Sequence, residues 1–161
     1  MIEQFLRLFR HEHPVTMKVL KALPGDKLDF KPHERNMTAG ELAWHVAYSQ
    51  YGLAAVVAAA KLEAYQALPV PASLDEIVAG GETYYQKAVE VVRGLTPEQL
   101  GRKVEPVGVP CERLLWDGVL FHQIHHRGQL AIYIRMMGGK VPSIYGPSAD
   151  ENPFAQAGAA A

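Results

Sequence analysis

The fold is decided by residues 111–137, which read CERLLWDGVLFHQIHHRGQLAIYIRMM and are followed by Gly138-Gly139. Apolar side chains recur along this stretch with the period of an α-helix, and a glycine pair is a typical helix stop. The stretch therefore predicts one long helix that begins near Cys111 and ends at Met137.

Three earlier segments share this helical period and end at connectors rich in proline or glycine; they cover about Ile2–Leu23, Thr38–Gln66 and Ser73–Gly94. The second and third segments open with a capping box, in which Thr38 or Ser73 accepts from a backbone N–H and Glu41 or Glu76 reaches back to the cap. Pro14 lies inside the first segment. It is expected to kink or divide that helix, because proline removes a backbone donor.

The remaining connectors predict little regular structure. Residues 96–99, Thr-Pro-Glu-Gln, predict a single helical turn, whereas Lys103–Pro110 alternates valine with proline and glycine and favours an extended connector over a strand in a sheet. Four amphipathic helices with connectors of mixed length predict an all-α four-helix bundle. At 161 residues the chain is expected to form one domain, residues 1–154, with a loose C-terminal tail at residues 155–161.

Charge and composition exclude several classes of protein. The chain has 16 Lys and Arg against 17 Asp and Glu and no basic run, so we expect neither a nucleic-acid partner nor a membrane partner. Its most apolar run, Leu53–Ala60, is far shorter than the ~20 residues of a membrane span. The N-terminus does not resemble a signal peptide, and the single cysteine, Cys111, excludes an intramolecular disulfide and a thiolate-cluster zinc site. These features predict a soluble, cytoplasmic protein.

Three of the seven histidines lie within the long C-terminal helix. His122 and His126 are ~40° apart around this helix and one turn, ~6 Å, apart along it, so both imidazoles can point toward one ion. The same stripe, which we interpret as inward-facing, also holds Leu115, Gln129 and Tyr133. His125 lies on the other side of His122 and is a poorer candidate ligand for the same ion.

A third donor is needed, because two histidines alone form a weak site. His45 is the best candidate, since it lies beside Leu42 and Val46 on the predicted buried face of the second helix. Three further histidines are less convincing, because they lie near Pro14 or in a polar loop: His11, His13 and His33. The alternative is that the histidines are hydrogen-bonded core residues of a plain bundle, since spacing does not show that the two helices face each other.

The chain resembles the DinB/YfiT-like family of metalloproteins over nearly its whole length. Three stretches carry the resemblance, and they are residues 28–45, residues 122–130 with the pattern HQIHHRGQL, and residues 133–148. The resemblance implies a four-helix bundle that holds a divalent ion, commonly nickel or zinc, on three histidines that match His45, His122 and His126. It also implies a homodimer. Some members of the family are thiol S-transferases or thiol-dependent isomerases that use low-molecular-weight thiols.

An ion held by three neutral imidazoles keeps its full +2 charge and at least one free coordination position, as in a catalytic rather than a closed structural site. Such an ion lowers the pKa of a bound water from 15.7 to roughly 7, or it binds and activates a thiolate. Two neighbours are candidate catalytic residues, each with a plain core role as its alternative: Gln129 would orient a ligand or a bound water, and Tyr133 would donate to a metal-bound group. Arg127 is expected to be solvated or to bridge helices, and Cys111 to be a small buried hydrophobe.

These observations predict a cytoplasmic enzyme that needs a divalent metal ion and acts on a small-molecule substrate, as a thiol S-transferase or as a hydrolase. A low-molecular-weight thiol is the further cofactor expected in the first case. The alternatives are a non-catalytic metal-binding stress-response protein and a plain helical bundle that binds no metal.

Overall fold

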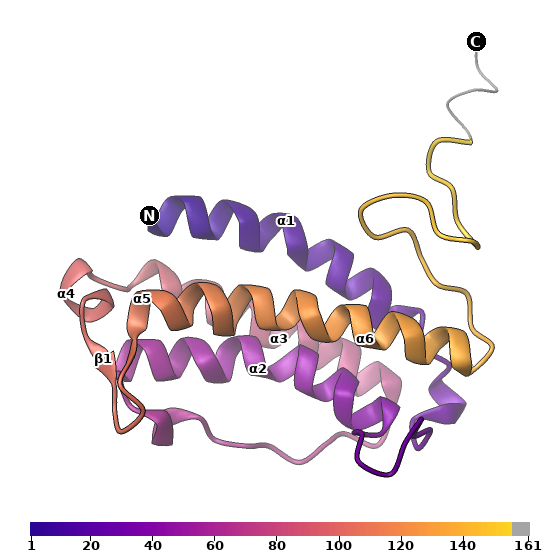
Figure 1. Ribbon diagram of the computed structural model, residues 1–161, viewed down its shortest axis with the longest axis horizontal. Coiled ribbons are helices and arrows are strands. Elements are labelled where there is room, and N and C mark those ends of the chain that lie inside the picture. Colours follow the sequence, from indigo (N-terminus) through magenta and orange to yellow (C-terminus); the bar gives the residue numbers. More distant parts are fainter. Residues whose placement is uncertain (156–161) are drawn as a thin grey trace.

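The chain folds into a bundle of four long helices in a computed structural model that describes residues 1–155 (Figure 1). The helices are α1 (Ile2–Lys21), α2 (Ala39–Ala59), α3 (Leu74–Arg93) and α6 (His122–Met136). The helices α2 and α1 each pack against both α3 and α6, so that α1 and α2 lie across the bundle from each other. The predicted all-α four-helix bundle is therefore confirmed. Of the tail predicted at residues 155–161, all but Ala155 lies outside the described residues.

The long C-terminal helix is confirmed, but it is not α-helical throughout. It starts with the short helix α5 (Cys111–Leu114), continues as the π-helical segment η3 (Leu115–Phe121) and becomes α6 at His122. Bonds in a π-helix span five residues and widen the turn, so the phase of an α-helix does not carry across η3. Leu115 is fully buried, as its predicted inward-facing position requires, whereas His122 is only half-buried.

Pro14 kinks the first helix without dividing it. Residues 2–21 form one unbroken helix, and Figure 1 shows that its second half runs at an angle to its first half. Proline cannot donate to the carbonyl one turn earlier, which opens the helix on one side. The first of the two outcomes expected for Pro14 is therefore the one that the structure shows.

The second helix ends earlier than predicted, at Ala59 instead of Gln66. Ala60 adopts a left-handed conformation with φ of 55°, and its carbonyl accepts from the Glu105 N–H at 3.0 Å. The Leu62 N–H in turn donates to the Glu105 carbonyl at 2.9 Å. This pairing with a distant segment overrides the helical tendency of residues 60–66. After the short 3-10 helix η2 (Leu62–Ala64), residues 65–72, here called the strap, run to α3 without forming a helix or a strand.

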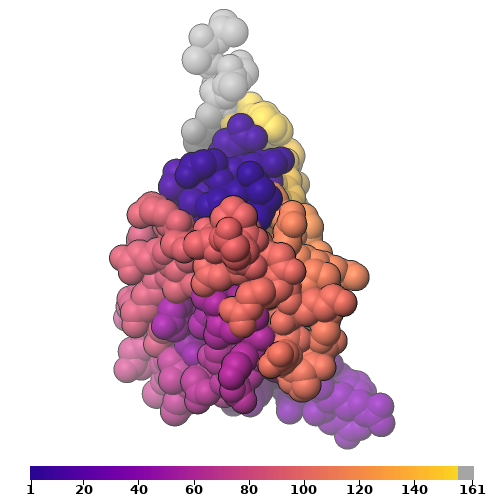
Figure 2. Space-filling view, turned by 90° about the vertical axis from the view of Figure 1, so that its left-hand side faces the viewer, coloured from indigo at the N-terminus to yellow at the C-terminus, as the bar shows by residue number. Residues whose placement is uncertain are grey.

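The connector at residues 103–110 forms a small sheet, so the prediction that it contains no strand is wrong. The strands β1 (Lys103–Val104) and β2 (Val109–Pro110) pair antiparallel, with Lys103 opposite Pro110 and Val104 opposite Val109. Gly108, with φ of +71°, makes the turn that returns the chain. Just before this connector, α4 (Pro97–Leu100) is the predicted single turn, and this region closes one end of the bundle (Figure 2).

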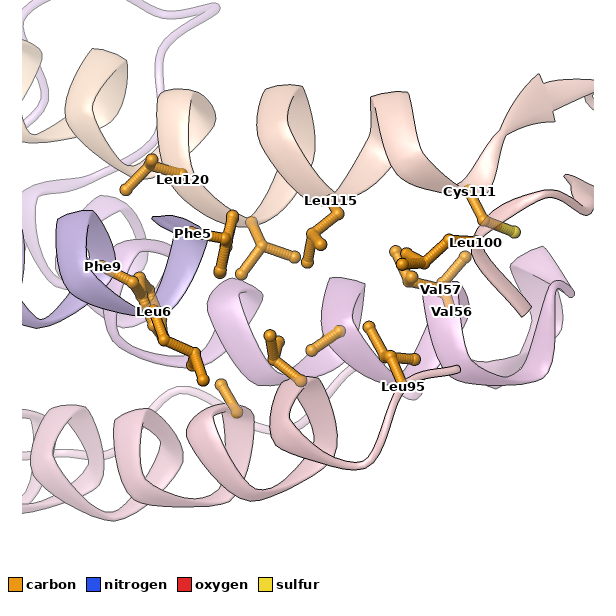
Figure 3. Packing of buried hydrophobic residues seen from close by; sticks show 14 of the residues in the cluster. Phe5, Leu6, Phe9, Val56, Val57, Leu95, Leu100, Cys111, Leu115 and Leu120 are labelled. Carbon is orange, nitrogen blue, oxygen red and sulfur yellow. The ribbon is translucent and has the colours of Figure 1, made fainter. Parts of the chain in front are cut away.

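Two apolar clusters fill the core, one toward each end of the bundle. The first packs residues from α1, α2, α3 and the start of the C-terminal helix, including Phe5, Phe9 and Leu115 (Figure 3). The second lies at the other end and includes Leu20 and Ile134. Along the chain, the buried polar residues fall between the two clusters; this polar layer consists of Glu12, Thr16, Ser49, Gln50, Gln123 and Arg127.

Within residues 1–155, none of the helices has both the length and the apolar character needed to cross a membrane.

Candidate metal centre

Three imidazoles from two helices meet beside the polar layer. The Nε2 atom of His122 on α6 lies 3.0 Å from Nε2 of His45 on α2 and 3.1 Å from Nε2 of His126. Their three ligand atoms lie within 4.8 Å of one another. The spacing of the sequence left open whether α2 and α6 face each other. The structure shows that they do, and the predicted convergence of the three histidines is confirmed.

Two of the three separations between ligand atoms of the triad match those around a single divalent ion. At a Zn–N distance of 2.0–2.1 Å, two nitrogens on a tetrahedral ion are about 3.3 Å apart, which is close to the two Nε2 separations described above. Within residues 1–155, no further histidine and no cysteine or carboxylate joins the three imidazoles. All three rings are half-buried, so the cluster is partly accessible to solvent. A ligand set of this kind leaves room on an ion for a small molecule.

The electrostatic surroundings keep the three rings neutral. Burial, reinforced by the neighbouring His126, His45 and His125, lowers the pKa of His122 to about 4. Burial and the nearby His126 also lower the pKa of His45, and burial lowers the pKa of His126. A metal ion binds only neutral imidazole, so the triad is in the binding form at neutral pH.

Gln129 holds one of the three rings in place. Its Oε1 atom lies 2.6 Å from Nδ1 of His126, and its Nε2 atom lies 3.2 Å from Nε2 of His125. An acceptor on Nδ1 fixes the proton there and leaves Nε2 of His126 free to bind a metal. Gln129 is exposed and bonds within its own helix, so its inward-facing position is corrected. The contact matches the role of orienting a ligand, whereas the metal-ligand role of His126 itself stays a prediction.

Tyr133 is buried, and its hydroxyl is already engaged. The hydroxyl donates to the carbonyl of Met37 at 3.2 Å and accepts from Nδ2 of Asn36 at 3.0 Å. Its ring also packs edge-on against Phe30. These contacts tie α6 to the loop before α2, which is the core role that the sequence left as the alternative. Donation by Tyr133 to a metal-bound group stays a prediction.

The other histidines and the cysteine lie outside the triad. His11, His33 and His125 are exposed. His13 stacks on Tyr85 with 3.6 Å between ring centroids, and its Nε2 atom lies 2.9 Å from Glu82. Cys111 is fully buried among apolar residues, and burial raises the pKa of its thiol, so it is the small hydrophobe that was predicted.

Sequence reasoning missed a buried ion pair next to the triad. Arg127 is only 1% exposed and donates to Glu12 at 2.7 Å and to Thr16 at 3.1 Å. The Tyr145 hydroxyl accepts from the same guanidinium and donates to Glu12 at 2.7 Å. The prediction of a charge that bridges helices is confirmed, and the prediction of a solvated charge is wrong. A polar residue interrupting the apolar stripe of α1, at Glu12, was the available signal.

A small pocket adjoins the triad, and the sequence analysis did not predict it because residues 60–66 were expected to continue the second helix. Its volume is about 170 Å³, and His45 and Glu41 form part of its wall. The rest of the wall is aromatic or apolar and consists of Met37, Trp44, Tyr48, Tyr65, Ala67 and Leu68. One side chain of the triad is therefore also a side chain of the pocket.

The chain is similar in sequence to a known protein family and to two individual proteins. The sequence matches the DinB family over residues 1–156. Two proteins of Bacillus subtilis (strain 168) are similar to it. YrdA is 31% identical over 160 residues, covering 93% of this chain and 91% of YrdA. YjoA is 30% identical over 139 residues, covering 84% of this chain and 90% of YjoA.

Solved structures show the same fold. The crystal structure of YjoA, a DinB-like protein, matches with a TM-score of 0.72 at 29% identity, covering 88% of this chain and 96% of that chain. A DinB-like protein from Bacillus cereus ATCC 10987 matches with a TM-score of 0.71 at 27% identity, covering 89% and 97%. Because sequence and fold agree over nearly the full length, the chain belongs to the DinB family.

Proposed function

We propose that this chain is a metal-dependent enzyme that joins a low-molecular-weight thiol to a small electrophilic molecule. One observation carries the proposal: three neutral imidazoles converge through Nε2 in a half-open site that no carboxylate or cysteine of residues 1–155 completes. A nickel or zinc ion bound there supplies a Lewis acid that lowers the pKa of a coordinated thiol or water. Hydrolysis of a small ester or amide needs the same three histidines and is therefore the competing reaction.

Each residue near the site has a definite task in this proposal. His45, His122 and His126 hold the ion without cancelling its charge, because neutral imidazoles bring none. Gln129 fixes the tautomer of His126 through its Nδ1 atom. The thiol must come from outside the chain, since Cys111 is fully buried in the core. We also propose a cytoplasmic location, where a reducing environment keeps thiols available.

Metal binding is tested first. Protein purified without a histidine tag is expected to hold nearly one equivalent of nickel or zinc, measured by elemental analysis. His45→Ala, His122→Ala and His126→Ala are each expected to lose the ion and to keep the helical circular dichroism spectrum, because the apolar core holds a chain of this size without a metal. His33→Ala is the matched control, since this histidine is exposed and outside the triad. The site would be refuted by a wild-type protein that holds no metal, or by a variant with all three histidines replaced by alanine that still holds the ion.

Turnover is tested next with the loaded protein. Conjugation of low-molecular-weight thiols with a chromogenic aryl halide is measured beside the cleavage of nitrophenyl esters and anilides. We expect conjugation that disappears in the folded His45→Ala variant. Cleavage of the esters or anilides alone would replace the proposal by a hydrolase. A loaded protein that turns over neither class would favour the non-catalytic metal-binding stress-response protein.

A further inference from the structure

We propose that the pocket beside His45 is a substrate subsite that takes an aromatic or similarly flat apolar group without negative charge. This inference rests on the proposed function, because it names the kind of molecule that acts at the triad. Trp44, Tyr48 and Tyr65 provide the aromatic wall, and Glu41 provides the charge.

Two glycines keep the aromatic wall in position. A Cβ atom added at Gly52 would lie 2.6 Å from Cε2 of Tyr65, and one added at Gly80 would lie 2.5 Å from Cζ3 of Trp44. Glycine in the middle of a helix costs about 1 kcal/mol relative to alanine. The helices α2 and α3 thus accept weaker local stability at the two places where a side chain would displace a ring of the pocket.

The polar ends of two wall residues are engaged by the strap. The indole N–H of Trp44 donates to the carbonyl of Leu68 at 3.3 Å, and the hydroxyl of Tyr48 donates to the carbonyl of Gln66. Neither side chain has a second donor, so Trp44 offers a ligand only its ring, and Tyr48 offers its ring and an acceptor oxygen. Ring faces favour flat apolar groups. The volume of about 170 Å³ suits a single ring, because benzene binds in an apolar cavity of about 150 Å³.

Glu41 sets the charge that the pocket accepts. Its Oε2 atom accepts from the Thr38 N–H at 2.7 Å, and the hydrogen bonds from Thr38 lower the pKa of this carboxyl group. The group is therefore negative at neutral pH. An anionic substituent in the pocket would be repelled by it, whereas a neutral or cationic one would not.

His45 belongs both to the pocket and to the triad. The same side chain that lines the pocket presents its Nε2 atom to the triad, 3.0 Å from Nε2 of His122. A molecule with its ring in the pocket therefore lies next to an ion held by the triad. A ligand made of a metal-binding group attached directly to a ring is the matching probe.

The apolar preference is tested by calorimetry on the zinc-loaded protein with two hydroxamates, which differ only in the group next to the chelating atoms. We expect benzohydroxamate to bind about tenfold or more tightly than acetohydroxamate, because a ring leaves water. Ala67→Phe fills the pocket from the exposed strap and is expected to reduce this preference to less than about threefold, with acetohydroxamate unchanged. Ala72→Phe is the matched control, since it adds the same ring to the strap outside the pocket wall.

The charge preference is tested with 4-carboxybenzohydroxamate. We expect the wild-type protein to bind it about tenfold more weakly than benzohydroxamate and Glu41→Gln to remove most of this difference. Glutamine still accepts from the cap, so the helix is retained. Glu76→Gln, in the corresponding capping box of α3, is expected to leave the difference unchanged.

The outcomes separate this subsite from the proposed function. Zinc binding is measured first without any hydroxamate, and its absence would overturn the proposed function together with the subsite. Zinc binding with equal affinity for benzohydroxamate and acetohydroxamate would overturn the subsite alone. The subsite alone would also be overturned if Ala67→Phe and Ala72→Phe lowered the affinity for benzohydroxamate equally.

Discussion

The orientation of His126 is set by an acceptor on its own helix, because Oε1 of Gln129 lies 2.6 Å from its Nδ1 atom. Loss of such a partner typically weakens metal affinity 10–100-fold. We therefore expect Gln129→Leu to lower the affinity for zinc by roughly this factor, measured by competition with a chromogenic chelator. Gln129→Glu keeps an acceptor at this position and is expected to bind zinc at least as tightly as the wild type.

The matched control for this change is Gln86→Leu on α3. Gln86 is also exposed and also bonds within its own helix, to Glu82 at 3.0 Å. Its loss should leave zinc affinity unchanged. An unchanged affinity in Gln129→Leu would show that the orientation of His126 comes from packing alone.

The buried pair of Glu12 and Arg127 is expected to contribute strongly to stability. Removal of one member leaves the other charge buried without a partner, which costs about 3–5 kcal/mol. We expect Arg127→Met to lower the free energy of unfolding by this amount in urea, and the double variant with Glu12→Gln to recover part of the loss. A loss below about 1 kcal/mol in Arg127→Met would contradict the buried pair.

The triad predicts how the stability of the metal-free protein depends on pH. His122 has a pKa of about 4 in the folded chain, below the ordinary value of 6.5, because burial disfavours its charged form. The unfolded chain therefore binds a proton more readily as pH falls from about 6.5 to about 4, and the free energy of unfolding falls across this window. Urea titrations at several pH values measure the slope. His122→Asn is expected to flatten it and His33→Ala to leave it unchanged.

The residues of the triad were predictable, whereas their polar surroundings were not. His122 and His126 share a helix face by spacing alone, and the apolar neighbours of His45 mark the facing helix. Glu12 and Arg127 lie on different helices far apart in the sequence. Nothing local links such partners, so their pairing appears only once α1 lies against α6.

Alanine in place of a helical glycine usually stabilises the helix, but at the two glycines beside the pocket it is expected to destabilise the protein. Gly80→Ala adds a Cβ atom 2.5 Å from the indole of Trp44, and overpacking of this kind typically costs about 1–3 kcal/mol. We expect this clash to outweigh the gain in helix propensity and to lower the thermal midpoint of unfolding. Scanning calorimetry of the metal-free protein measures it.

Gly128→Ala is the matched control for this prediction. A Cβ atom at Gly128 on α6 would meet nothing within 4 Å. Only the propensity gain of up to about 1 kcal/mol remains, so its thermal midpoint is expected to rise. A rise in both variants would show that the ring of Trp44 moves aside freely.

The starts of the elements were easier to predict than their ends. Thr38 and Ser73 form the predicted capping boxes, and Thr96, which was predicted only to open a single turn, forms a third, because a capping box is a local interaction. The end of α2 depends on pairing of residues 60–62 with Glu105, and the π-helical segment η3 carries no local signal. A long-range contact therefore decided where α2 ends, which the sequence did not predict.

At the scale of the whole molecule, the exposed side of the C-terminal helix carries large apolar side chains. Phe121, Ile132 and Met136 are 51%, 61% and 55% exposed. Apolar side chains gathered on one exposed helix often form contacts between proteins. We propose that α6 forms the interface of a homodimer, with a second copy of the chain as the partner.

Sedimentation equilibrium tests this proposal. We expect a particle with twice the chain mass of 17.7 kDa, and a monomer for Ile132→Asp, because the dimer would bury an unpaired charge. Val107→Asp is the control, since Val107 is 53% exposed but lies in the turn between β1 and β2. If the wild-type protein is a monomer, or if both variants dissociate equally, α6 does not form the interface.

The buried ion pair also has a consequence for how related chains vary. Arg127 follows the proposed ligand His126 directly, so an uncompensated guanidinium there would repel a dication, and the carboxylate of Glu12 neutralises it from a helix that bears no ligand. Replacement of either residue alone would affect both folding and ion affinity. In natural homologues the two positions are therefore expected to change together, so that an apolar residue at one accompanies an apolar residue at the other.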